Sequence, residues 1–173
     1  MDLKAAILKE HSKAQAILVR DYIDADQSRF DELMTHFYGN EHRVTQRAAW
    51  IMMHCVEKYP FLLNKHLEKL VHNLQNKNLH VAVKRNTVRV LQDVELPEDL
   101  MGIAADCCFG YLLDPKEAVA VRAFSMTVLY NICKKEPDLS EELRLVIEEH
   151  LPYGTAAFQS RGKKILKALQ KLR

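Results

Sequence analysis

A short phrase that pairs valine with arginine recurs along this chain at an almost constant interval. It ends at Arg47, Arg85, Arg122 and, in a weaker form, Arg161, so successive arginines are 38, 37 and 39 residues apart. Each of the first three arginines is followed by an apolar run, a proline and a second apolar run; the prolines are Pro60, Pro97 and Pro137. A fixed period of this length is typical of helical hairpins that stack into a solenoid, because one hairpin cannot bury its apolar face alone.

Helix start and stop signals predict about nine helices and no strand. We expect the first helix over residues 3–22, and either Asp24 or Asp26 as the cap of the next one. Asp114 followed by Pro115 is interpreted as the start of a further helix. Only five glycines and five prolines occur, which is too few for the many turns of a β-protein. The predicted fold class is therefore all-α, a right-handed α–α superhelix.

We expect one domain that contains three kinds of segment. They are an atypical N-terminal hairpin (residues 1–39), three regular hairpins (residues 40–151) and a basic C-terminal capping helix (residues 152–173), together residues 1–173. The net charge is only +2, but it is unevenly spread. Residues 87–160 carry 6 Lys or Arg against 13 Asp or Glu, whereas residues 161–173 carry 6 basic residues and no acidic one.

A reducing cytoplasm is the expected location. No apolar run approaches the roughly 18 to 20 residues that a membrane span needs. Charged residues interrupt the apolar ones in residues 1–10, so we expect no signal peptide there. Of the four cysteines, Cys107 and Cys108 are adjacent, which is a poor geometry for a disulfide, and no zinc-site spacing occurs.

One loop of the predicted array carries a family signature. Asp114-Pro115 followed by Val121-Arg122, between two apolar helices, resembles the signature of the HEAT repeat. The weaker copies, with asparagine in place of the aspartate, are Asn78 with Arg85 and Asn40 with Arg47. The resemblance covers residues 40–173, and the repeat length lies just below the usual length of about 40 to 47 residues for HEAT and armadillo units. It implies a helical solenoid and says nothing about activity.

Two more distant resemblances bear on function. HEAT-like DNA alkylation repair glycosylases share the architecture and bind DNA with tryptophans and an aspartate on a basic concave face. This chain has one tryptophan, Trp50, and no matching motif, so no site is carried over. The chain also resembles small bacterial helical-repeat proteins that bear an adenylosuccinate lyase name. That family's serine-bearing loop, Ser-Ser-x-Met-Pro-x-Lys-x-Asn, is missing, and lyase activity is not expected.

The recurring arginines have two interpretations. In the first they form a structural ladder that bonds loop carbonyls and the side chains of Asn40, Asn78 and Asp114. In the second Arg47, Arg85, Arg122 and Arg161 form a spaced row that binds phosphates, which requires them to be exposed.

The basic terminal helix likewise has two interpretations. Its cations are Arg161, Lys163, Lys164, Lys167, Lys171 and Arg173. They form either the solvated face of a capping unit or a contact for nucleic acid or for an acidic surface. On a neighbouring copy that acidic surface would be Asp138, Glu141, Glu142, Glu148 and Glu149.

A third cluster shares one face of the Arg47 helix, because its members follow at steps of three and four residues; they are Arg47, Trp50, His54 and Glu57. Arg85, Arg89 and Gln92 occupy the comparable face one unit later. This strip is our candidate for partner binding, together with Lys163, Lys164 and Lys167. The alternative is packing between neighbouring repeats.

No pattern in the chain predicts catalysis, a metal or a cofactor. The eight histidines show no metal-ligand pairing, no glycine-rich phosphate loop occurs, and Asp106 and Asp114 have no mapped pocket. We therefore expect a non-enzymatic module that binds another protein. The alternatives are a nucleic-acid binder that uses Lys84, Arg85, Arg89 and the terminal lysines, and a homo-oligomer of undetermined order. The acidic balance of residues 87–160 favours the protein partner over the nucleic acid.

Overall fold

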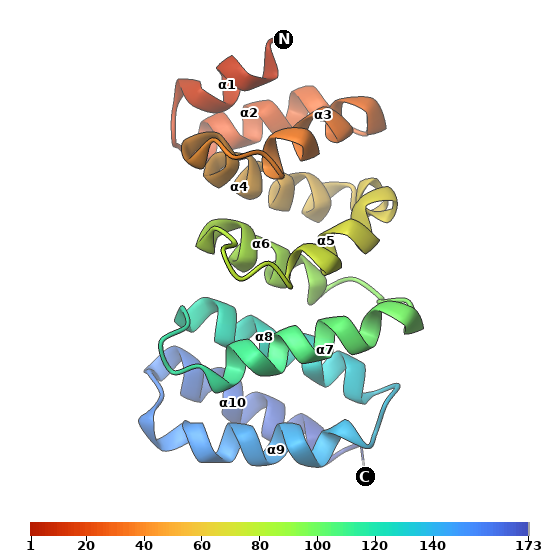
Figure 1. The fold of residues 1–173 in the computed structure, drawn as a ribbon, viewed down its shortest axis with the longest axis vertical. Helices are drawn as coiled ribbons and strands as arrows, with labels where there is room; N and C mark the ends of the chain where they lie inside the picture. The colour runs from red at the N-terminus through yellow and green to blue at the C-terminus, as the bar shows by residue number, and fades with distance from the viewer. Residues whose placement is uncertain (173) are drawn as a thin grey trace. The chain divides into compact units, whose positions relative to one another are not determined.

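The computed structural model describes residues 1–172, and over that range it holds ten α-helices, two short 3₁₀ helices and no strand (Figure 1). The predicted all-α class is confirmed. The chain divides into two compact units, residues 1–90 and the segment from Leu91 onward. The first unit holds α1 (Leu3–Lys9), α2 (Lys13–Ile23), α3 (Gln27–Phe37), α4 (His42–Lys58), η1 (Pro60–His66), α5 (Leu67–Asn73) and most of α6 (Val81–Leu91). The second holds α7 (Glu98–Leu113), α8 (Val119–Cys133), α9 (Leu139–His150), η2 (Leu151–Tyr153) and α10 (Ala156–Leu169).

The single first helix expected over residues 3–22 is wrong, and this break accounts for the tenth helix. The chain leaves the helical conformation at Glu10, and Ser12 then caps α2 by accepting a hydrogen bond from the Gln15 amide at 3.1 Å. A serine hydroxyl can satisfy an amide that a helix start leaves unpaired, so it favours a new start over a continuous helix.

The aspartates of two connecting turns have different roles. Asp26 caps α3, since its Oδ1 accepts hydrogen bonds from the amides of Ser28 and Arg29 at 2.8 and 3.1 Å. Asp114, expected to begin a helix with Pro115, instead ends α7 and accepts from the Lys116 amide at 2.9 Å. The turn closes with a bond from the Glu117 amide to the Asp114 carbonyl, and α8 begins later, at Val119.

In the first unit the apolar faces of α1, α2 and α3 pack against α4. Figure 1 shows α4 beside α2 and α3. Phe30 and Phe37 of α3 and Met52 of α4 are fully buried there. The apolar stripe predicted after Pro60 is buried as well; its members are Leu63, Leu67, Leu70, Val71 and Leu74.

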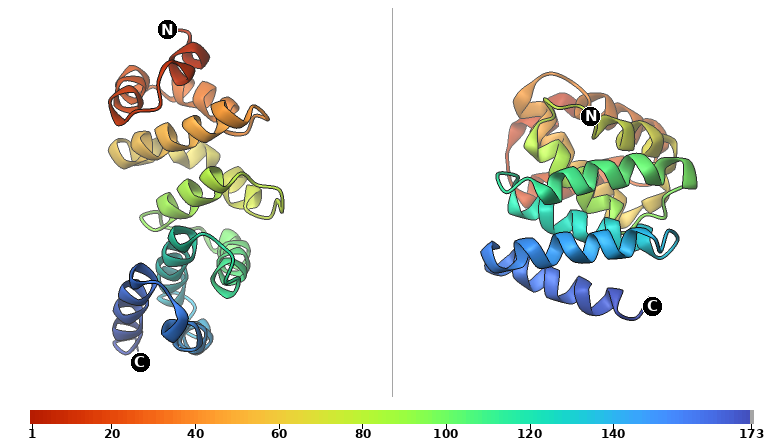
Figure 2. Two further views of the ribbon diagram at one scale, coloured as in Figure 1. Left: turned by 90° about the vertical axis from the view of Figure 1, so that its left-hand side faces the viewer. Right: turned by 60° about the horizontal axis from the view of Figure 1, so that its bottom comes forward.

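In the second unit α8 is the central helix and contacts α7, α9 and α10. Figure 2 shows α9 and α10 lying side by side at the C-terminal end. Gly162 of α10 is buried at this contact, where an added Cβ would lie 2.7 Å from Leu151 Cδ1 and 3.1 Å from Ile147 Cγ2. The glycine therefore allows α10 to approach α9 closely.

No helix within residues 1–172 is long and apolar enough to cross a membrane. The right-handed superhelical course of the whole array stays a prediction.

Candidate partner-binding surface

Arg122 is a buried arginine with internal partners. Its side chain comes from α8, and only 8% of the residue is exposed. Nε and Nη2 donate to the Leu112 carbonyl at 3.1 and 2.9 Å, and the guanidinium carbon lies 4.5 Å from the centre of the Phe158 ring. Burial lowers the pKa of Arg122, and the attraction of Asp114 opposes that shift. The side chain thus joins the ends of α7 and α10 to α8.

The arginines at the other repeat positions have different environments. Arg47 Nη1 donates to the carbonyls of Ile7 and Leu8 at the end of α1, at 3.2 and 2.8 Å. Arg161 Nη1 donates to Gln92 Oε1 at 2.8 Å and to the Thr127 hydroxyl. Arg85 is exposed and, among the described residues, makes no hydrogen bond or ion pair. Within residues 1–172 the expected bonds to the side chains of Asn40, Asn78 and Asp114 do not form: Arg47 and Arg122 donate to carbonyls, Arg161 donates to other side chains, and Arg85 is exposed to solvent.

Trp50 and His54 make internal contacts in the first unit. The half-buried Trp50 ring lies edge-on to His11, with ring centres 5.4 Å apart, and 5.8 Å from His54. His54 Nδ1 lies 3.2 Å from a Glu57 oxygen, and burial lowers the pKa of His54 despite the opposing charge of Glu57. Glu57 also pairs with Arg89 at 3.0 Å. Of the predicted strip, Glu57, Arg85 and Arg89 are exposed to solvent.

An open groove lies between α8 and α10 in the second unit. Its volume is about 620 Å³. Its lining is apolar except for a hydroxyl and two cations, and we call the apolar part its floor and the polar part its edge; the lining residues are Val119, Ala120, Ala123, Phe124, Ala157, Ser160, Arg161 and Lys164. We call this the α8–α10 groove. Val119 is 37% exposed, so apolar surface is open to solvent at a place where a partner can cover it.

The cations of α10 are unneutralised. Lys163, Lys164 and Lys167 are exposed, and over the described part of the chain neither they nor Arg161 pairs with a carboxylate. Lys164 lines the groove, and Lys167 follows one turn later on the same side. Lys163 is about 100° away around the helix and does not line it. Arg173 lies outside the described residues.

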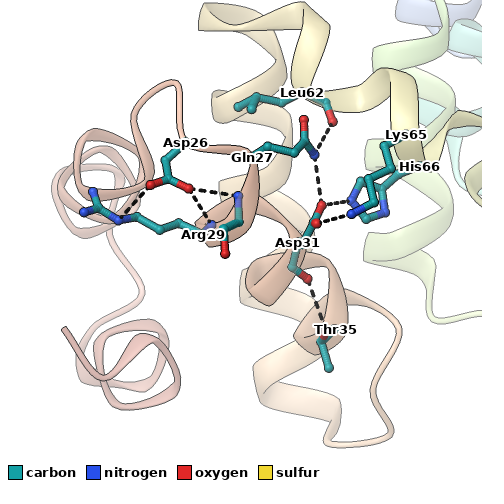
Figure 3. Close-up of polar contacts among 9 residues, drawn as sticks. Asp26, Gln27, Arg29, Asp31, Thr35, Leu62, Lys65 and His66 are labelled. Atoms are coloured by element: carbon teal, nitrogen blue, oxygen red, sulfur yellow. Dashed lines mark hydrogen bonds and ion pairs between the residues drawn. The ribbon is translucent and has the colours of Figure 1, made fainter.

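A polar cluster that the sequence analysis missed joins α3 to η1 (Figure 3). Asp31 accepts hydrogen bonds from Gln27 Nε2 at 2.9 Å and from His66 Nε2 at 2.6 Å, and it pairs with Lys65. Gln27 Nε2 also donates to the Leu62 carbonyl at 3.1 Å. The hydrogen bond from Lys65, followed by that from Gln27, holds the pKa of Asp31 well below its usual range. Lys65 and His66 lie more than thirty residues from Asp31 in the sequence, so these two partners give no local signal.

Asp31→Ala is expected to lower the free energy of unfolding by about 1 to 2 kcal/mol, because three donors lose a partly exposed charged acceptor. Since the pKa of Asp31 is depressed, its contribution is present above the unfolded pKa of about 4 and lost as the pH falls further. Urea unfolding at neutral and acidic pH measures both effects. The neighbouring exposed Glu32→Ala is the control, and equal losses for the two variants would contradict the role of Asp31.

The packed helical hairpins define a helical-repeat protein, a fold of the protein-interaction scaffold kind. The family model of the HEAT repeat domain matches residues 3–169, and the chain belongs to this family. The match includes the first hairpin, where the signature residues are absent. HEAT repeat proteins are generally not enzymes. No curated protein and no solved structure matches the chain.

Proposed function

We propose that this chain is a protein-interaction module whose α8–α10 groove binds an acidic amphipathic helix of a partner protein. The observation that carries the proposal is the coincidence of an open apolar floor with cations that have no acidic partner. The array of residues 1–173 acts as one domain, without catalysis. The four cysteines are unpaired thiols, which supports a cytoplasmic location.

The floor of the groove suits apolar side chains of a helix. On α8 the groove is lined by Val119, the half-buried Phe124 and two alanines, and on α10 by the small residues Ala157 and Ser160. A partner helix with apolar residues at steps of three and four can place them between α8 and α10. Covering this surface removes apolar area from water, which provides the affinity.

The edge of the groove selects the charge of the partner. Arg161 and Lys164 line it, and Lys167 extends the same side. Because these cations lack carboxylate partners in the described structure, glutamates or aspartates beside the apolar residues of the partner would complement them. The charges chiefly determine which partner binds, since exposed ion pairs add little affinity each.

A nucleic acid is the less favoured ligand. A phosphate backbone gains nothing from the apolar floor, and the net charge of −7 over residues 87–160 repels it. Arg85, Arg89 and Lys84 belong to the other unit, and we do not assign them to this groove.

Lys164→Glu is expected to weaken binding of a designed acidic amphipathic peptide by about five- to thirtyfold, which is about 1 to 2 kcal/mol. The reversed charge repels the glutamates of the peptide and leaves the fold intact, since Lys164 is exposed. Lys163→Glu makes the same charge change on the same helix outside the groove and should weaken binding less than threefold. Titration calorimetry of both variants measures the difference.

The natural partner is tested by capture from native lysate with the tagged chain, its K164E variant and its K163E variant, each with and without nuclease. Protein bands that survive nuclease and disappear only with K164E support the groove. Bands that K164E does not change overturn the groove as the binding site. Recovery of nucleic acid alone, lost on nuclease treatment and at high salt, overturns the protein-partner class. Self-association that K164E abolishes would identify a second copy as the partner.

A further inference from the structure

Two histidines from neighbouring repeat loops face one another in the first unit. His42 begins α4 and His80 immediately precedes α6, 38 residues later, at the spacing of the repeat. Their Nε2 atoms are 2.8 Å apart and their ring centres 4.2 Å apart. The pair borders a polar cavity of about 290 Å³, which the side chains of Asn40, Asn73, Asn76 and Asn78 also line.

The backbone determines which nitrogen of each ring carries a proton. The Ala82 amide donates to His80 Nδ1 at 2.9 Å, and a backbone amide can only donate, so Nδ1 is unprotonated. The proton of a neutral His80 is therefore on Nε2, from which it is donated to His42 Nε2. His42 Nε2 must then be the acceptor, and the proton of a neutral His42 is on Nδ1.

We propose that the His42–His80 pair is a pH-sensitive joint that holds the start of α4 to the start of α6 only while both imidazoles are neutral. A proton added to His42 places two N–H groups against each other. A proton added to His80 Nδ1 faces the Ala82 amide and removes the cap of α6. Either event breaks a hydrogen bond and replaces it with repulsion, so acid opens the joint and the adjoining cavity.

No charged side chain of the described residues lines the cavity beside the pair. The cavity lining within the described residues contains no Asp, Glu, Lys or Arg; besides the two histidines, its titratable group is Tyr38, whose ring lies under Lys69. Four charged residues lie within four positions of the pair in sequence. Glu41 pairs with Lys4, and the remaining three are the cations Arg43, Lys77 and Lys84.

The direction of the effect follows from the pKa of His80. Burial lowers this pKa, and repulsion from His42 lowers it further. A histidine whose pKa is depressed in the folded chain binds its proton more readily in the opened chain. The joint is thus stable above the unfolded pKa of about 6.5 and loses stability as the pH falls below it.

The tautomers are tested first, by long-range ¹H–¹⁵N spectra of the imidazoles in the whole chain at about pH 7.5. We expect His80 protonated at Nε2 and His42 at Nδ1. Amide exchange then measures the opening. The protection factors of the first-turn amides of α6, from Ala82 to Arg85, should fall up to about tenfold per pH unit below about pH 6.

The matched variant is His42→Gln with His80→Asn. Asparagine can accept from the Ala82 amide and donate to glutamine, so the hydrogen-bond polarity persists without a titrating group. In this variant the protection of α6 should no longer depend on pH. His72→Gln, an exposed histidine of α5, should leave the pH dependence unchanged. A pH dependence that survives the double substitution, or a native His80 protonated at Nδ1 at neutral pH, overturns the joint. Because the tautomers are measured in the native chain, this result does not depend on the folding of a variant.

Discussion

Replacing Arg122 with alanine is expected to lower the free energy of unfolding by about 3 kcal/mol, and the same replacement at Arg85 to change it by less than about 0.5 kcal/mol. The two residues occupy the same position of successive repeats. Arg122 is buried, bonds the Leu112 carbonyl twice and stacks on Phe158, whereas Arg85 is exposed and unpaired among the described residues. Removal of the Arg122 side chain leaves the buried Leu112 carbonyl without this donor and leaves a space beside the Phe158 ring.

Urea unfolding of both alanine variants, followed by circular dichroism, measures the difference. Arg122→Lys serves as a second probe, because a single ammonium cannot reproduce the two bonds and the stacking; it should recover less than half of the loss. Equal effects at Arg85 and Arg122 would show that the repeat position, rather than its burial, determines stability. Full recovery by lysine would show that charge alone matters.

A valine at Gly162 is expected to destabilise the chain by about 2 to 3 kcal/mol. The added Cβ alone meets Leu151 Cδ1 of η2 at 2.7 Å and Ile147 Cγ2 of α9 at 3.1 Å, and the two further methyl groups crowd these side chains more. The smaller Gly162→Ala change should cost less, because better helix propensity offsets part of the clash.

Gly110→Ala is the control for Gly162. Gly110 lies on the exposed face of α7, where an added Cβ meets nothing within 4 Å. Alanine there should stabilise the chain by about 0.5 to 1 kcal/mol, because it restricts the unfolded state. Thermal unfolding of the three variants gives the comparison. Stabilisation by valine at Gly162 would contradict the close approach of α10 to α9.

Much of the local structure could be predicted from the sequence, since it depends on neighbours a few residues away. Asp26, one of the two aspartates expected as the cap, caps α3, and the apolar stripe after Pro60 is buried. The two errors of local structure, at Ser12 and Asp114, arise where polar side chains bond nearby amides and interrupt or delay a helix. Helical periodicity does not reveal such competition.

The candidate site was less predictable. Lys164 and Lys167 were recognised from their charge, but the apolar floor contributed by α8 was not, because Val119 and Phe124 look like core residues in sequence. Arg47 and Trp50 looked like partner-facing residues and instead contact the end of α1 and His11. Helical spacing shows which face of its own helix a residue occupies. Whether that face is buried depends on a second element that packs against it.

By itself the sequence determined the all-α class, the repeat of about 38 residues and local features such as the apolar stripe after Pro60, because capping, proline placement and apolar periodicity act within one or two turns. Only the tertiary structure decided which repeated residues acquire partners. It buries Arg122 and leaves Arg85 exposed, and it brings His42 to His80. The physical reason is that burial and hydrogen-bond satisfaction depend on atoms supplied by distant residues, and identical positions of a repeat need not meet identical neighbours.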